Sequence, residues 1–217
     1  TAQVAALSND QINALSTSNI KSLATDNLQA LTATQLQGMT TTQLQSLTTT
    51  QVTQLSTGQV REMTNTVVSG LSTGQIGALT TSQVKYLSAA VINTLSTTNL
   101  NAMGTAQVNA LTNDQVKVMT TGQVLALGTT QVSALTSGQI SVLNATNVAA
   151  MSTDMVNLLT STQVQGLSLS VVPGITTDKV AKMFPNRPAL SATTGLALAM
   201  VPPPSEYVIF GVEVPAS

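Results

Sequence analysis

The sequence predicts an all-α solenoid, a stack of very short helices with one helix in each eight-residue repeat. Three observations support this prediction. Apolar residues recur with a period of eight from Ser8 to Met183, which gives 22 contiguous octads after a partial one at residues 1–7. Nearly every octad begins with a residue typical of a helix N-cap, and its two constant apolar positions lie three residues apart. A unit this short is unstable alone and must stack on its neighbours.

The first half of each octad matches the start of a helix. Position one is Ser, Thr, Asn or Gly in every octad except the one at Ala24, and position four is Gln or Asn in 17 of 22. In a capping box such as Thr48–Gln51, the hydroxyl accepts from the Gln51 N–H and the Gln51 side chain reaches back to the Thr48 N–H. Leu47 and Val52 flank this cap as a hydrophobic staple. We therefore expect a cap followed by a helix of about five or six residues.

The second half supplies the buried face. Position five is always Val, Ile or Leu, and position eight is always Leu, Met or Ile. These positions share one face of a helix, whereas in a strand they point to opposite faces. This spacing favours the helix over a β-solenoid, which the Thr and Val content leaves as the alternative. Position seven is usually Ala, Ser or Gly, and a small residue there lets neighbouring backbones approach.

Charged residues follow the direction of the predicted helices. Acidic residues near a helix N-terminus and basic residues near its C-terminus each contribute about 0.3–1 kcal/mol through the helix dipole. Five acids occupy position three, namely Asp10, Asp26, Asp114, Asp154 and Asp178. Four bases occupy position six, namely Lys21, Arg61, Lys85 and Lys117.

A weaker period of sixteen lies over the period of eight. Glycines at position three (Gly58, Gly74, Gly122 and Gly138) all lie in octads of one parity, and most repeat methionines lie in octads of the other parity. This pattern suggests two octads per coil, with one helix on each side.

The repeats end after Met183, so we divide the chain into an octad solenoid, residues 1–183, and a C-terminal segment, residues 184–217. This segment contains a Pro-Pro-Pro spacer and one stretch, residues 207–214, that is the best strand candidate of the chain. It is a cap over the solenoid end, an arm that joins a neighbouring subunit, or an irregular, disordered tail. The arm hypothesis names as contact residues Phe184, Tyr207, Val208, Ile209, Phe210, Val212 and Val214.

Composition argues against several classes of function. The chain has no His and no Cys, and its net charge is −1, which disfavours acid–base catalysis, thiolate metal sites and nucleic-acid binding. No apolar run is long enough to span a membrane. We therefore expect no enzyme activity, no cofactor and no metal. The pairs Asn9-Asp10 and Asn113-Asp114 carry too few oxygen ligands for calcium, and the threonine ladders leave ice binding as a remote alternative.

The unit Leu-Thr-Thr-x-Gln-Val-x-Ala resembles the octapeptide arrays of very large bacterial surface-exposed or secreted repeat proteins, which are often adhesin-like. The resemblance covers residues 1–183 and excludes the C-terminal segment. It implies an extracellular or cell-surface location and a spacer, filament or attachment role, and it carries no catalytic or binding residues.

Two functional hypotheses follow. The first is an extracellular structural protein that assembles end to end with copies of itself through the C-terminal segment, into a filament or surface layer. The second is an adhesin spacer or binding module that contacts a cell-surface or glycan partner. Binding sites are rich in exposed Tyr, Trp and Arg, and the repeats offer only Tyr86 and Arg61. This scarcity favours the structural hypothesis.

Overall fold

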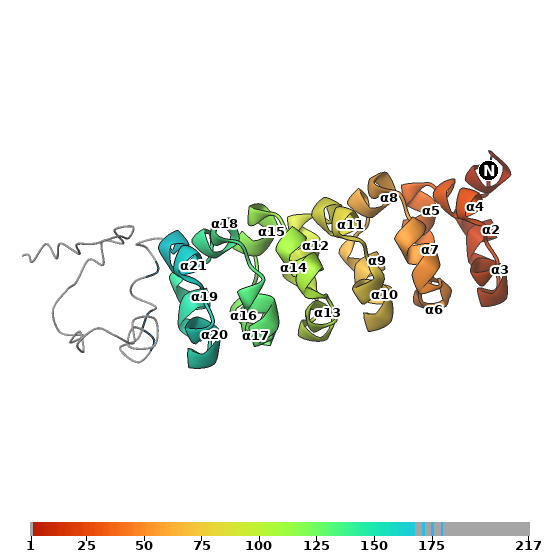
Figure 1. Ribbon diagram of the computed structural model, residues 1–217. Helices are drawn as coiled ribbons and strands as arrows, with labels where there is room; N and C mark the ends of the chain where they lie inside the picture. Colours follow the sequence, from red (N-terminus) through yellow and green to blue (C-terminus); the bar gives the residue numbers. More distant parts are fainter. Residues whose placement is uncertain (1, 168–170, 172–174, 176–178, 180–217) are drawn as a thin grey trace, which may run out of the picture.

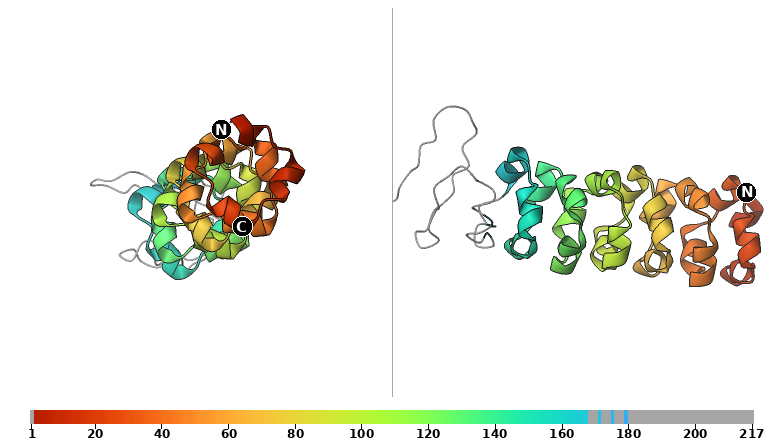
Figure 2. Two further views of the ribbon diagram at one scale, coloured as in Figure 1. Left: turned by 90° about the vertical axis from the view of Figure 1, so that its right-hand side faces the viewer. Right: turned by 60° about the horizontal axis from the view of Figure 1, so that its bottom comes forward.

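A computed structural model of the chain describes residues 2–167 together with Val171, Ile175 and Lys179. These residues form an elongated rod of short helices, with the N-terminus at one end (Figure 1). Seen along its axis, the rod has a rounded cross-section (Figure 2). The second predicted domain, residues 184–217, and the strand proposed within it lie outside the described residues.

The described part of the chain contains 21 helices of four to six residues and no strand, which confirms the all-α solenoid and excludes the β-solenoid alternative there. The helices are α1 (Ala2–Ala5), α2 (Asn9–Asn13), α3 (Thr17–Lys21), α4 (Thr25–Gln29), α5 (Ala33–Gly38), α6 (Thr41–Ser46), α7 (Thr49–Gln54), α8 (Thr57–Arg61), α9 (Asn65–Gly70), α10 (Thr73–Ala78), α11 (Thr81–Tyr86), α12 (Ala89–Thr94), α13 (Thr97–Asn101), α14 (Thr105–Ala110), α15 (Asn113–Lys117), α16 (Thr121–Ala126), α17 (Thr129–Ser133), α18 (Ser137–Ser141), α19 (Ala145–Ala150), α20 (Thr153–Asn157) and α21 (Ser161–Gly166).

Each helix from α2 onward begins where the octad pattern predicts, with position one as the N-cap in extended backbone. In α7 the capping box is complete: Thr48 accepts from the Gln51 N–H, and the Gln51 side chain accepts from the Thr48 N–H. Ala24, the exception at position one, caps α4 without a side-chain hydrogen bond. At Gly104 the reciprocal half remains, because the Gln107 side chain still accepts from the Gly104 N–H.

Helices stack three places apart along the chain. Nearly every helix packs against the one three octads later, as α8 does against α11 and α11 against α14. Three octads therefore make one turn of the solenoid, and the hypothesis of two octads per coil is wrong. The turns form three rows of helices, and we call the row that contains α2, α5, α8, α11, α14, α17 and α20 row B. At 8–10 Å per stacked helix, seven turns give a rod of about 55–70 Å.

Positions five and eight form one continuous core along the rod. Val52, Val84, Val116 and their equivalents at position five are essentially inaccessible to solvent, and most position-eight residues are almost as well buried. Leu47 and Val52, the predicted staple, both belong to this core. Each helix thus buries one apolar face against its own turn and the turns on either side, which is how helices this short remain folded.

Small residues allow close backbone approach at the contacts between turns. A Cβ atom added to Gly166, at position seven of α21, would lie 2.6 Å from the carbonyl oxygen of Ser137 in α18. The glycines that suggested a sixteen-residue period make no such contact, since a Cβ atom at Gly74 would meet nothing within 4 Å. The spacing of these glycines therefore does not reflect packing between turns, and it gave the wrong number of octads per coil.

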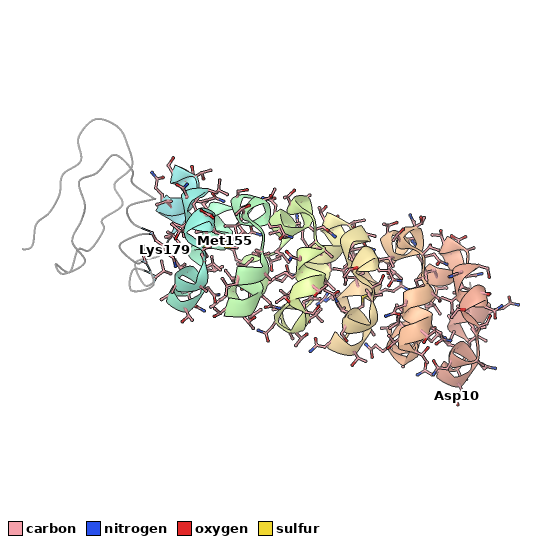
Figure 3. All side chains as sticks on the ribbon, turned by 90° about the horizontal axis from the view of Figure 1, so that it is seen from below. Asp10, Met155 and Lys179 are labelled. Carbon is pink, nitrogen blue, oxygen red and sulfur yellow. The ribbon has the colours of Figure 1, made fainter. Side chains whose placement is uncertain are left out.

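The charge pattern is confirmed wherever the structure describes it. Asp10, Asp26, Asp114 and Asp154 lie in the first turns of their helices, and Lys21, Arg61, Lys85 and Lys117 lie in the last turns. Asp178 lies outside the described residues. In Figure 3, Asp10 lies at one end of the rod, and Met155 and Lys179 lie toward the other.

Candidate functional site

The most regular polar feature of the structure is the side chain at position four. Gln83 shows the full arrangement: its Oε1 accepts from the Thr80 N–H at 2.8 Å, and its own N–H donates to Thr80 Oγ1 at 3.1 Å. Its Nε2 also donates to two carbonyl oxygens of another octad, those of Val52 and Leu55, both at 2.8 Å. One side chain thus caps its own helix and ties it to the octad four units earlier.

This double role recurs along the rod, and we call the set of these side chains the glutamine ladder. Every member donates from Nε2 to the carbonyls 31 and 28 residues earlier and is buried. The members are Gln35, Gln43, Gln51, Gln59, Gln75, Gln83, Gln107, Gln115, Gln123, Gln131, Gln139 and Gln163.

The ladder solves a problem that short helices create. A helix leaves its last carbonyl groups without intrahelical partners, and a helix of six residues consists largely of its ends. The ladder amides reach the carbonyl at position five and the carbonyl at position eight, which lies in the turn before the next N-cap. Among the described residues, no buried side-chain nitrogen or oxygen lacks a hydrogen-bond partner. The ladder therefore holds successive turns in register without leaving buried polar groups unpaired.

The sequence predicted the capping half of this arrangement and missed the ladder. A capping box accepts Glu as readily as Gln, and Glu would also suit the positive end of the helix dipole. Position four nevertheless contains no Glu in any octad. The absence of Glu agrees with the use of the side-chain NH₂ group as a donor.

Several octads depart from the ladder. Val67, Val91 and Met155 place an apolar side chain at position four and are buried. Asn147 is one carbon shorter than Gln, and its Nδ2 reaches only the Met119 carbonyl, at 3.2 Å. Lys179 occupies position four of the octad at residues 176–183, in which it is the one residue that the structure describes.

Lys179 replaces the ladder amide with an amine. Its Nζ donates to the carbonyl oxygen of Val148, 31 residues earlier, at 3.0 Å, and also to that of Ala149. The side chain is 5 % exposed, and its burial lowers the pKa of the amine below its ordinary value near 10.5. The ladder register thus extends to residue 179, beyond the last complete helix described.

A second set of amides points the opposite way along the rod. The position-six side chains of Gln29, Gln37 and Asn109 donate to the position-seven carbonyls of the octad three units later. Asn109 Nδ2, for example, lies 2.8 Å from the Ala134 carbonyl oxygen. These exposed hydrogen bonds join neighbouring helices of one row on the outside, while the ladder joins turns on the inside.

A shallow groove lies on row B, between α11 and α14. It has a volume of about 510 Å³ and is open to solvent. Its lining combines the Lys85 amine, threonine hydroxyls and the Asn109 amide with alanines from α14 and the end of α17. Tyr86, the residue after Lys85, is 49 % exposed. Arg61 and Tyr86 are far apart in the sequence, and the stacking of α8 on α11 places them on one row with Lys85.

The threonine ladders noted in the sequence lie on different rows of the solenoid. Thr40–Thr42 and Thr48–Thr50 begin α6 and α7, which belong to different rows. In the row of α6, the next two helices, α9 and α12, carry Asn65 and Ala89 at position two. The other two rows do carry matching residues at position two. They are Thr25, Thr49, Thr73, Thr97 and Thr121 in the row of α7, and Thr57, Thr81, Thr105, Thr129 and Thr153 in row B. Ice binding stays a remote prediction.

All seven predicted subunit-contact residues, from Phe184 to Val214, lie outside the described residues. Within the described residues, no group of three or more acidic, His or Cys side chains is placed to hold a metal ion. None of the described helices is long and apolar enough to cross a membrane.

Comparison with known proteins agrees with the repeat architecture. A family model described as the ALTTAQ repeat matches residues 54–89 and 90–121. The two matches cover the centre of the rod, from the end of α7 to the start of α16. No curated protein matches the chain. The chain therefore contains a known class of repeat, in agreement with the array of octads that the structure shows.

Proposed function

We propose that this protein is a non-enzymatic structural rod that acts outside the cell and joins end to end with copies of itself through residues 184–217. The observation that carries the proposal is the use made of the polar side chains inside the rod. The ladder amides are buried and hydrogen-bonded to the backbone, as Gln83 is to Val52 and Leu55. Side chains so engaged hold the shape of the rod and are not available to bind substrate.

The connectivity of the rod also supports a mechanical role. Most octads from α5 onward are bonded to the octad four units earlier through position four, and some are bonded to the octad three units later through position six. The core is continuous from Ile12 to Val171. A rod joined in this way resists bending and opening at any single turn, because each turn is held by its neighbours on both sides.

The surface suits a passive scaffold. Charged residues make up 7 % of the chain, so changes in salt concentration have few surface charges to screen. The C-terminal segment contains both phenylalanines of the chain, Phe184 and Phe210, and one of its two tyrosines, Tyr207. Aromatic residues are enriched at subunit contacts, which supports this segment as the joining element.

The second candidate is an adhesin spacer or binding module, and one observation favours it. Row B brings Arg61, Lys85 and Tyr86 onto neighbouring helices, α8 and α11. These are residue types that recognition surfaces use. This role is compatible with a rod, since a spacer also needs a stiff array.

Negative-stain electron microscopy of the full chain, beside a chain truncated after Met183, tests the proposal. We expect filaments from the full chain and separate short rods from the truncated chain. Tyr207→Ser combined with Phe210→Ser should also abolish filaments, whereas Tyr86→Ser, which removes an exposed aromatic residue from the repeats, should not. Separate rods in every sample would reject end-to-end assembly and leave the spacer as the better account.

A further inference from the structure

We propose that octad 64–71, which contains α9, opens as a unit while the rest of the rod stays folded. The first step of the argument concerns the glutamine ladder on the earlier side. Val67 stands at position four, where a ladder glutamine would donate to the Leu36 and Met39 carbonyls. A valine side chain has no donor, and the side-chain hydrogen bonds of this octad stay within it. The octad is therefore not bonded to the octad four units earlier.

The ladder is missing on the later side as well. The Val68 and Leu71 carbonyls lie 31 and 28 residues before Asn99, which stands at position four of its own octad. Asn99 is buried, and its backbone N–H donates to Ser96 Oγ. Its side chain is one carbon shorter than that of Gln and forms no ladder bond within the described residues. Octad 64–71 thus neither donates nor accepts in the ladder.

This combination occurs once among the octads whose ladder partners on both sides are described. Every other such octad donates at position four or accepts at positions five and eight. Octad 88–95, for example, has Val91 at position four, yet its Ile92 and Leu95 carbonyls accept from Gln123. Among these octads, octad 64–71 is therefore the one that packing alone holds against its neighbours.

Apolar packing holds α9 in the closed rod. Val67, Val68 and Leu71 are buried in the core, and α9 packs against α6 and α12. The next octad, residues 72–79, buries its own apolar face and is in addition bonded through the ladder to an earlier and a later octad. Segments of a protein open in the order of their local stabilising contacts. We therefore expect α9 to open before α10.

Opening of α9 does not divide the rod. Gln75 and Gln83 follow the octad in the chain, and they donate to carbonyls of octads 40–47 and 48–55, which precede it. These hydrogen bonds span α9, which lies between the two ends of the rod (Figure 1). The inference thus concerns one octad of an intact rod, and it does not rest on assembly through the C-terminal segment.

Native-state hydrogen exchange of the ¹⁵N-labelled full chain tests this inference. The Val68 and Ile76 N–H groups donate to the carbonyls of their own N-caps at 3.1 and 3.0 Å, so both are protected in the same way in the closed rod. After correction for intrinsic rates, we expect Val68 to exchange at least about ten-fold faster than Ile76, which corresponds to about 1.4 kcal/mol of opening free energy. Exchange of Val68 should also depend less on urea concentration, because opening of one octad exposes little surface.

A variant that restores the ladder on the later side tests the cause. Asn99→Gln lengthens the side chain so that its amide reaches the Val68 and Leu71 carbonyls. We expect Val68 to exchange about five-fold more slowly in this variant, since one net hydrogen bond of about 1 kcal/mol gives about that factor. The matched control is Asn19→Gln, the same change at an exposed position four, which should alter the exchange of Val68 less than about two-fold.

Three outcomes would overturn the inference. Equal exchange of Val68 and Ile76 in the original chain would mean that α9 is held as firmly as α10. Unchanged exchange of Val68 in Asn99→Gln would show that the missing ladder bonds are not what frees α9. Equal slowing in Asn99→Gln and Asn19→Gln would indicate a general effect of the longer amide. The first comparison uses the unmodified chain, so it holds whether or not the variants fold.

Discussion

At the residue scale, the identity of one side chain carries most of the structure. Gln at position four has an oxygen that caps its own helix and a nitrogen that bonds the octad four units earlier. The capping half is local, three residues apart, so the sequence predicted it. The ladder half joins residues 28 and 31 apart, and no local rule specifies which turn lies at that distance.

Replacement of a ladder glutamine by glutamate separates these two roles. Gln83→Glu keeps an oxygen to accept from the Thr80 N–H but removes both donors and places an anion against the carbonyls of Val52 and Leu55. We expect a loss of about 2–4 kcal/mol at pH 8, measured by urea denaturation with circular dichroism. The loss should shrink as the pH falls, because a protonated carboxyl group can again donate.

The matched control is Gln11→Glu. Gln11 forms the same capping box with Ser8, but its side chain is exposed. We expect a change within about 0.5 kcal/mol, with a small gain from the helix dipole. Equal losses at Gln11 and Gln83 would mean that the capping half accounts for the stability and that the ladder contributes little.

Because Lys179 stands where most octads have Gln, we expect it to make the stability of the folded chain depend on pH in a way that Gln would not. Because burial lowers the pKa of Lys179 in the folded chain, the unfolded chain binds more protons between that lowered pKa and about 10.5. The contribution of Lys179 to stability therefore rises with pH across this interval and is lost as the pH falls through the lowered pKa. Other groups titrate equally in both proteins, so the difference in urea midpoint between Lys179→Gln and the original chain isolates this effect.

We expect Lys179→Gln to be the more stable protein at neutral pH, with an advantage that decreases as the pH approaches 10.5. Lys117→Gln removes an exposed lysine and should show no such trend. A pH-independent difference between Lys179→Gln and the original chain would show that the amine is not desolvated in its ladder position.

At the element scale, each helix is too short to be stable alone and depends on contacts with the turns on either side. The sequence predicted where each helix begins because caps and staples are local patterns. It did not predict how many octads make one turn, since that number depends on how closely the backbones of stacked helices approach. Glycine parity was a misleading guide, because Gly74 has open space around it.

Two glycines of α10 test the close approach between turns. A Cβ atom at Gly77 would lie 2.9 Å from the Ala102 carbonyl oxygen, whereas one at Gly74 would meet nothing within 4 Å. Gly74→Ala should stabilise the protein by up to about 1 kcal/mol through helix propensity. Gly77→Ala should instead destabilise it by about 1–3 kcal/mol through overpacking. Similar gains in thermal midpoint for both variants would contradict the packing of α10 against α13.

At the scale of the whole molecule, the sequence predicted a solenoid because a strict period and a shared apolar face leave few other ways to bury the core. The predicted contact residues of the C-terminal segment remain a prediction. The groove on row B could not be predicted, because Lys85 and Asn109 are 24 residues apart and become neighbours only when three octads form one turn. The number of octads per turn sets the length of the rod and decides which residues of different octads become neighbours on its surface.

The distance between spin labels at positions 10 and 154 of the full chain measures this number directly. The chain has no cysteine, so Asp10→Cys with Asp154→Cys gives two defined labels, both at exposed position-three sites on row B. These sites are eighteen octads apart, which is six turns at three octads per turn. A double electron–electron resonance experiment should give a narrow distribution near about 50–60 Å, at 8–10 Å per turn. A narrow distribution near about 70–90 Å would indicate two octads per turn, and a broad distribution would contradict a rigid rod.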